Sequence, residues 1–235
     1  MLYLRRLSSE SRAIYTRREI MPNWVTNKVV APSHVIASML NVNDAIDFSL
    51  IEAFPGEFPW DSVSMAAEQL AEIVVRRPLS DHPVIARLEA ANRANASLKD
   101  LNDEAFEQFI QMLRNHRKCG FFERMGFARE RWGTKWNACE SSADVVAGTA
   151  SFETAWSCPM PVYIGLSKKF PDDRIDVKYA DEDIGSNCGM FALLGGEVIE
   201  SNEAPLWRDQ TDDQKAFWRG FACELIGYDP KDYED

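Results

Sequence analysis

Tryptophans concentrate in two nearby runs of the chain, beside side chains that can form hydrogen bonds or carry charge. The runs are RWGTKWNACES and FETAWSCPMP, and a predicted proline-led helix follows them. A tryptophan ring offers a large flat surface that can stack on a base, a sugar or a partner's side chain. With two asparagines that flank the first predicted strand, these residues form the candidate ligand- or partner-binding site. Its members are Asn23, Asn27, Trp132, Lys135, Trp136, Asn137, Glu153, Thr154 and Trp156.

The same residues also fit a role inside the fold. Large aromatic rings are mostly buried, so the tryptophans can equally pack a sheet against a helix. If WGTKWNA is a strand, alternation places Trp132, Thr134 and Trp136 on one face and Lys135 and Asn137 on the other. We expect the tryptophan face to be core. The Lys135/Asn137 face is then the better binding surface, for an anion or an amide, or else a plain solvated face. Asparagines at strand ends commonly satisfy turns.

Other groups with chemical potential give weaker signals. Glu153 and the run Asp181–Asp183 can act as acid and base or hold a cation, but the run lacks the glycine-containing spacing of a calcium loop. It fits an exposed acidic turn. Cys158 opens a predicted helix, where a thiolate is favoured, yet no histidine is near it in sequence. The sequence contains none of the common phosphate-loop, hydrolase, zinc-protease or kinase signatures. We predict no catalytic residue, metal site or cofactor.

Charge and cysteine usage narrow the class of protein. The chain of 235 residues has a net charge of −11. The first twenty residues hold five arginines against two glutamates, so they carry +3 and the remainder carries −14. An acidic body repels phosphate backbones, which disfavours nucleic-acid binding. The five cysteines are scattered and form no CxxC pair, which disfavours disulfides and structural zinc and predicts reduced thiols in the cytoplasm. No apolar run approaches the roughly 18 residues of a membrane span.

The first half of the chain is predicted as a βαβ segment that carries a helical insertion, residues 21–130. NWVTNKVVAP reads as a strand, Ser33 caps a short helix, and IDFSLIEAFP reads as a second strand. Helices are then predicted from Asp61, from Pro83 and from Asn102, the last of which ends at Gly120 with basic residues in its final turn. Residues 1–20 are predicted to be a flexible basic extension, with Met21 as the natural start.

The second half, residues 131–227, is predicted as a ββαββ unit with a C-terminal helix. After WGTKWNA come a strand over 144–156, a helix from Pro159 to about Phe170, an acidic-ended strand and a hairpin at Gly195-Gly196. A capping box of Thr211 and Gln214 opens the last helix, and residues 228–235 form an acidic tail. This order indicates an α+β fold with helices packed on one face of a mainly antiparallel sheet.

Three motifs together resemble the YubB-like family of phage and conjugative-plasmid proteins. They are MPNWVTNKV, RWGTKWNA and FETAWSCPMPVYIGLSKKFP. The resemblance covers most of residues 21–200 and implies a ferredoxin-like domain in the C-terminal part. The chain departs from the family at Cys158, where a proline is usual. The resemblance supplies no catalytic residues to carry over.

These observations favour a non-enzymatic accessory protein of a phage or other mobile element. Such a protein would bind a host protein or complex in the host cytoplasm, with counter-defence as a natural role. A different class is an enzyme or binding protein for a small nucleotide-like ligand, which would use the Trp/Lys/Asn cluster in a concave pocket. A third is single-strand nucleic-acid binding on an open sheet, which the acidic body opposes.

Overall fold

One antiparallel sheet of six strands organises the protein. The computed structural model describes residues 22–233, so the predicted N-terminal extension, residues 1–20, lies outside the described residues. The strands follow the order β2-β3-β1-β4-β5-β6 across the sheet. Their bounds are Trp24–Val30 for β1, Cys139–Asp144 for β2, Thr149–Ala155 for β3, Ile175–Asp181 for β4, Cys188–Leu194 for β5 and Glu197–Glu203 for β6.

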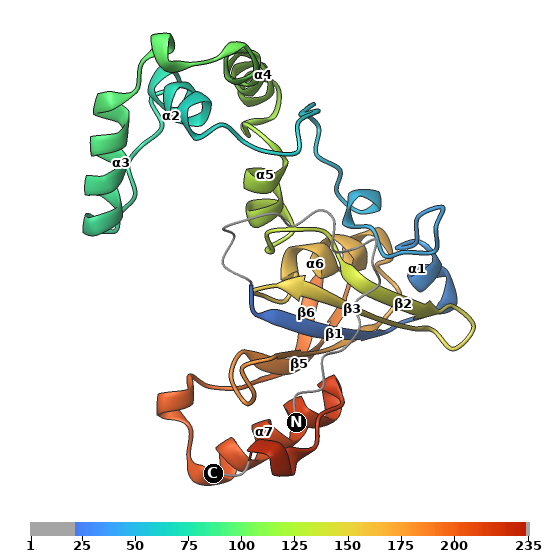
Figure 1. Cartoon of the computed structure of the whole chain (residues 1–235). Coiled ribbons are helices and arrows are strands. Elements are labelled where there is room, and N and C mark those ends of the chain that lie inside the picture. The colour runs from blue at the N-terminus through green and yellow to red at the C-terminus, as the bar shows by residue number, and fades with distance from the viewer. Residues whose placement is uncertain (1–21, 234–235) are drawn as a thin grey trace.

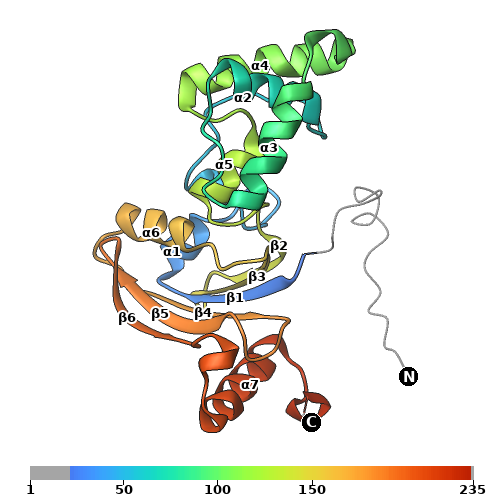
Figure 2. The same cartoon turned by 90° about the vertical axis from the view of Figure 1, so that its left-hand side faces the viewer.

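The strand order is that of a ferredoxin-like sheet with one edge extended. Strands β4-β1-β3-β2 form the four-stranded unit, and β5 and β6 add a hairpin beyond β4. Helices α1 (Ser33–Ala37) and α6 (Met160–Lys169) cover one face (Figure 2). The predicted α+β class with a ferredoxin-like antiparallel sheet is confirmed. One helix adds to that description, because α7 (Asp212–Ile226) packs on the opposite face.

Strand β1 lies at the centre of the sheet, although the sequence assigned it to a separate N-terminal segment. It pairs with β3 on one side and with β4 on the other, so the ferredoxin-like unit takes a strand from both halves of the chain. Val25 and Val29 point toward α1 and α6, where they join the main core. Its largest buried side chains include Phe48, Phe152 and Tyr163.

Four helices between β1 and β2 build a second compact part, which we call the helical lobe (residues 57–131). They are α2 (Met65–Val74), α3 (Pro83–Asn95), α4 (Asp103–Cys119) and α5 (Arg124–Arg131). The lobe has a hydrophobic core of its own around Leu70, Phe109 and Met112. It projects from the side of the sheet that α1 and α6 cover (Figure 1).

The segments that enter and leave the helical lobe lie next to each other. The indole Nε1 of Trp132 donates to the carbonyl of Glu52 at 2.8 Å, and the rings of Phe54 and Phe127 lie 5.5 Å apart. The two ends of the insertion are therefore held together by contacts of their own.

Several predicted helix and turn signals are confirmed. Asn102 caps α4 by accepting from the Ala105 amide, and Gly120 ends it in the left-handed region, with φ 84°. Thr211 and Gln214 form the capping box of α7. The Gly195-Gly196 pair turns the β5–β6 hairpin with positive φ at both residues. Short 3-10 helices complete the elements: Phe48–Leu50, Leu98–Asp100, Trp207–Asp209 and Pro230–Tyr233.

The strand predicted for IDFSLIEAFP is wrong. This segment makes a single bridge between Leu40 and Ile46 and then forms the 3-10 helix Phe48–Leu50. The carboxylate of Asp47 accepts from the Ser49 amide at 2.9 Å, which turns the backbone out of the extended conformation. Of the helices in the described residues, none is long and apolar enough to cross a membrane.

Candidate functional site

The WGTKWNA motif is not a strand, so the predicted alternation of its side chains is wrong. Residues 132–138 form an irregular connection between α5 and β2. Gly133 has φ +74°, and a Cβ there would lie 2.7 Å from the ring of Pro161. The Thr134 hydroxyl donates to the carbonyl of Ala155 at 2.8 Å, and the Ser157 hydroxyl donates to that of Gly133. These bonds tie the motif to the β3–α6 junction in place of a strand ladder.

Trp132 is half-buried and packs against the main core. Its indole N–H is used by the carbonyl of Glu52, and its ring packs edge-on against Phe48 at 5.7 Å and Phe127 at 5.9 Å. The residue therefore joins the main core to the helical lobe. The expectation of a core tryptophan holds for this position.

Asn137 organises a neighbouring turn, so it does not offer its amide to a ligand. Its Oδ1 accepts from the Phe48 amide at 2.9 Å, and its Nδ2 donates to the carboxylate of Asp47 at 2.8 Å. Partial burial of Asp47 works against ionisation, but hydrogen bonds from Ser49 and Asn137 outweigh it and hold the pKa of this carboxyl below its ordinary value. Because residues 132–138 are not a strand, Lys135 and Asn137 do not share a strand face as expected.

Asn27 and Thr154 are completely buried and bond to each other. The Asn27 Nδ2 donates to Thr154 Oγ1 and to the Val25 carbonyl, both at 2.9 Å. Its Oδ1 accepts from the Tyr163 hydroxyl at 3.1 Å, and Thr154 donates to the carbonyl of Ser157 at 2.8 Å. Burial raises the pKa of Tyr163 far above its ordinary value, so its hydroxyl remains a donor. These polar atoms are all used within the fold.

Asn23 supports the acidic end of β4. Its Nδ2 donates to Asp181 at 3.2 Å, and that carboxylate also accepts from the Asp183 amide and from Asn187. Asp181 is buried, whereas Glu182 and Asp183 are exposed, so the predicted exposed acidic turn is correct only for its last two residues.

Trp156 stands out at the end of β3. Its side chain is 45% exposed, and its backbone has φ +71°, in the left-handed region that a non-glycine residue rarely adopts. Its amide donates to the Asn23 carbonyl at 2.9 Å, and its own carbonyl accepts from Asn187. Side-chain and backbone bonds from two other strand ends therefore hold this tryptophan in place.

Trp136 and Lys135 lie beside the start of β1. The Trp136 ring is 6.0 Å from the ring of Trp24, and the Lys135 Nζ lies 4.4 Å from the Trp136 ring centroid, a cation–π distance. Trp24 directly follows Asn23, whose carbonyl binds the Trp156 amide. We call this group the tryptophan surface: Trp24, Lys135, Trp136 and Trp156.

The structure thus divides the predicted site into three groups. Asn27, Thr154, Trp132 and Asn137 are structural, and Asn23 positions the end of the sheet. Glu153 is half-buried on β3, one residue before Thr154 and therefore on the opposite sheet face. Lys135 and Trp136 are half-buried as well, and Trp156 is exposed. Trp24 was missed, although its place in the MPNW motif was a signal.

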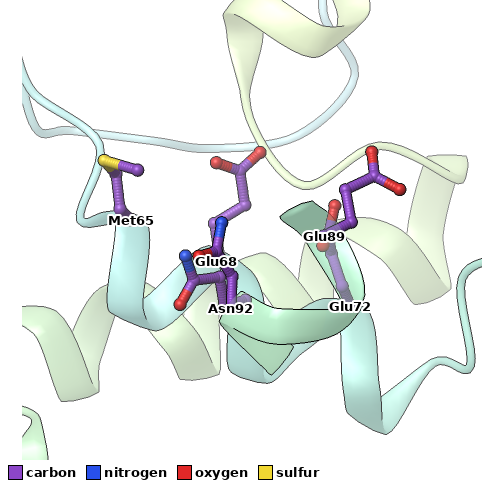
Figure 3. A pocket seen from close by; sticks show the side chains of 6 residues that line it. Met65, Glu68, Glu72, Glu89 and Asn92 are labelled. Carbon is purple, nitrogen blue, oxygen red and sulfur yellow. The ribbon is translucent and has the colours of Figure 1, made fainter. Parts of the chain in front are cut away.

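Among the described residues, no group of three histidine, cysteine, aspartate or glutamate side chains could hold a metal ion. Burial and the charge of Glu203 raise the pKa of Cys158 well above its ordinary value, which opposes thiolate formation. A groove does occur between α2 and α3 (Figure 3), but no residue of the predicted site lines it.

Residues 131–219 match the family model of a ferredoxin-like domain in Api92-like protein. The match to the Api92-like domain begins just before WGTKWN and ends within α7, so it leaves out β1. It supports a ferredoxin-like domain of this kind.

One solved structure also matches: the crystal structure of a protein api92 from Yersinia pseudotuberculosis. It shares 12% sequence identity over 79% of this chain and 99% of that chain, with a TM-score of 0.34. A TM-score this low supports no further conclusion. No curated protein matches the chain.

Proposed function

We propose that this chain is a non-enzymatic accessory protein that binds another protein through the tryptophan surface. The observation that carries the proposal is Trp156, a large exposed aromatic residue held at φ +71°. A non-glycine residue in this region costs on the order of 1–3 kcal/mol, and such strain tends to gather at functional sites. Exposure of the ring adds a second cost, because its burial would stabilise the fold.

Composition of the surface supports a protein partner. Tryptophan is enriched among the residues that dominate binding energy in protein interfaces, where it fills pockets of the partner. Lys135 places a cation over the Trp136 ring at a distance of 4.4 Å. The chain's net charge of −11 opposes a nucleic-acid partner.

The biological setting of the proposal comes from sequence. The resemblance to the YubB-like family supports a phage or other mobile element as the source and a host protein or complex in the host cytoplasm as the partner. Counter-defence is the role that we propose for such binding. The alternative, a small nucleotide-like ligand stacked on these rings, has less support because Asn137 and Thr154 use their polar atoms inside the fold.

A pull-down from host extract tests the proposal. The wild-type chain should retain a defined host protein, and Trp156→Asn, Trp136→Ala and Lys135→Glu should each lose most of it. Asparagine tolerates the left-handed backbone, so Trp156→Asn removes the ring without a backbone penalty. Phe106→Ala is the matched control, since Phe106 is 44% exposed in the helical lobe. Equal capture by all variants, or capture of nothing above background, would refute the proposal.

A further inference from the structure

Helix α3 exposes an aliphatic stripe. None of its residues, Pro83–Asn95, is buried. Val84 is 61% exposed, Ile85 47% and Leu88 61%. Residues 84 and 88 are one turn apart and residue 85 is adjacent, so the three side chains lie along one side of the helix. A helix of this length normally gains most of its stability by burying such a side.

Polar contacts fix α3 against α2 and the loop that precedes it. The guanidinium of Arg93 pairs with Glu72 of α2 at 3.1 Å and donates to the carbonyl of Arg77 at 2.6 Å. The Glu89 carboxylate accepts from the Ser80 amide at 2.8 Å. These bonds orient the helix while leaving its aliphatic stripe uncovered by the described residues.

An acidic groove runs beside that stripe, between α2 and α3 (Figure 3). No basic residue lines it, and its volume is about 170 Å³. Glu68 and Glu89 reach toward the same side of the groove from the two helices (Figure 3). Its lining consists of Met65, Glu68, Gln69, Glu72, Glu89 and Asn92.

The electrostatics of the groove favour a cation. Burial raises the pKa of Glu68, and the negative charges of Glu123 and Glu72 raise it further, against the opposing effect of Arg77 and Arg129. Ionisation of Glu68 is therefore disfavoured, and the part of this effect that comes from Glu72 and Glu123 is a negative potential that would attract a cation. The carboxylates of Glu68 and Glu89 can each accept hydrogen bonds from an ammonium or guanidinium group, which is the kind of cation that a protein partner supplies.

We propose that the α2–α3 groove and the aliphatic stripe of α3 form one docking surface for a basic amphipathic helix of a partner protein. A lysine or arginine of that helix enters the groove between Glu68 and Glu89. Its apolar side packs on Val84, Ile85 and Leu88, as in other helix-in-groove complexes. This surface is separate from the tryptophan surface, and the inference stands whether or not the proposed function does.

Charge selects this occupant over two others. A second copy of the chain that paired α3 with α3 about a two-fold axis would bring two acidic grooves together, and like charges repel. A nucleic acid or an anionic lipid surface would meet the same carboxylates. A positively charged helix gains from both the groove and the stripe.

Binding of designed peptides tests the surface on the full chain. The first probe is a fluorescent peptide with leucines along one helical side and lysines elsewhere. The second has every lysine replaced by glutamate. We expect the lysine peptide to bind at low ionic strength, more weakly as salt is added, and the glutamate peptide not to bind.

Two exposed substitutions should weaken that binding by about tenfold or more each. Leu88→Asp disrupts the stripe, and Asn92→Lys places a cation at the groove. The matched controls are Val42→Asp, at a residue that is 98% exposed, and Glu224→Lys on the exposed side of α7, and both should bind like the wild type. Circular dichroism checks that all four variants are folded.

Three results would overturn the proposal. They are no binding of the lysine peptide at low ionic strength, equal binding of the glutamate peptide, and equal loss in controls and test variants. Sedimentation adds a fourth: a wild-type dimer that Leu88→Asp converts to monomer would make this face a self-interface.

Discussion

The buried amide of Asn27 allows a sharp test of whether a predicted site residue is structural. Replacing Tyr163 by phenylalanine removes one oxygen atom and keeps the ring. The hydroxyl that donates to Asn27 Oδ1 at 3.1 Å is lost, and both residues are fully buried. The buried Oδ1 of Asn27 would then no longer accept a hydrogen bond from residue 163.

The expected loss of stability follows from that unsatisfied oxygen. A buried acceptor left without a partner costs about 1–3 kcal/mol. For a chain of this size each kcal/mol lowers the melting temperature by about 2–4 °C, so we expect a fall of about 2–12 °C for Tyr163→Phe. Urea unfolding should show a lower midpoint with an unchanged slope, because the extent of burial is the same.

A double-mutant cycle with Asn27→Leu completes the test. Each single variant leaves a buried polar partner unsatisfied, so the double variant should cost less than the sum of the two. Capture of the host partner should be unaffected in Tyr163→Phe. An undiminished midpoint, additive costs, or loss of partner capture in a stable Tyr163→Phe protein would refute the structural role that we assign to Asn27.

Further predictions concern three glycines and one glutamate. Gly148→Ala should destabilise by at least about 2 kcal/mol, because it places a side chain at strained positive φ and its Cβ would meet the Ala31 carbonyl at 2.4 Å. Gly120→Ala, at φ +84° with open space around it, should cost only about 1 kcal/mol in the same thermal melt. Gly133→Ala should lower the melting temperature, and Phe106→Ala is the control for a substitution at the surface. An unchanged melting temperature in Gly133→Ala would contradict the fixed geometry of WGTKWN. Glu68→Gln should raise stability at neutral pH, because the raised pKa of Glu68 means that its ionised form disfavours folding. That advantage should disappear as pH falls below the ordinary value of 4.5, and a constant difference between the two melting temperatures across this range would be the contrary result.

Local signals in the sequence predicted the elements that depend on local bonds. The cap at Asn102, the glycine stop at Gly120 and the capping box of α7 are formed by residues within one turn of each other. Such signals do not need the rest of the fold. The hairpin at Gly195-Gly196 belongs to the same class.

Predictions from the sequence were wrong where contacts with residues distant in the chain determine the backbone conformation. The WGTKWNA segment alternates in sequence, but Thr134 and Gly133 bond to residues more than twenty positions away, and these bonds replace the strand ladder. The burial of two predicted site residues was missed for a related reason. Asn27 and Thr154 gain their meaning from β1 and β3 lying side by side, and sequence proximity to a tryptophan does not reveal that pairing.

The insertion of the helical lobe bears on how the chain folds. Strand β1 is made early during synthesis but cannot pair until residues 149–155 and 175–181 exist. The lobe has its own core, and its contacts are mostly between residues closer in sequence than those of the sheet. It can therefore fold before β1 pairs with its neighbouring strands. Once folded, it holds Glu52 against Trp132, which turns a long flexible connection into a short effective loop. Because loop-closure entropy grows with loop length, the lobe lowers the entropic barrier to inserting β1 between its two neighbours.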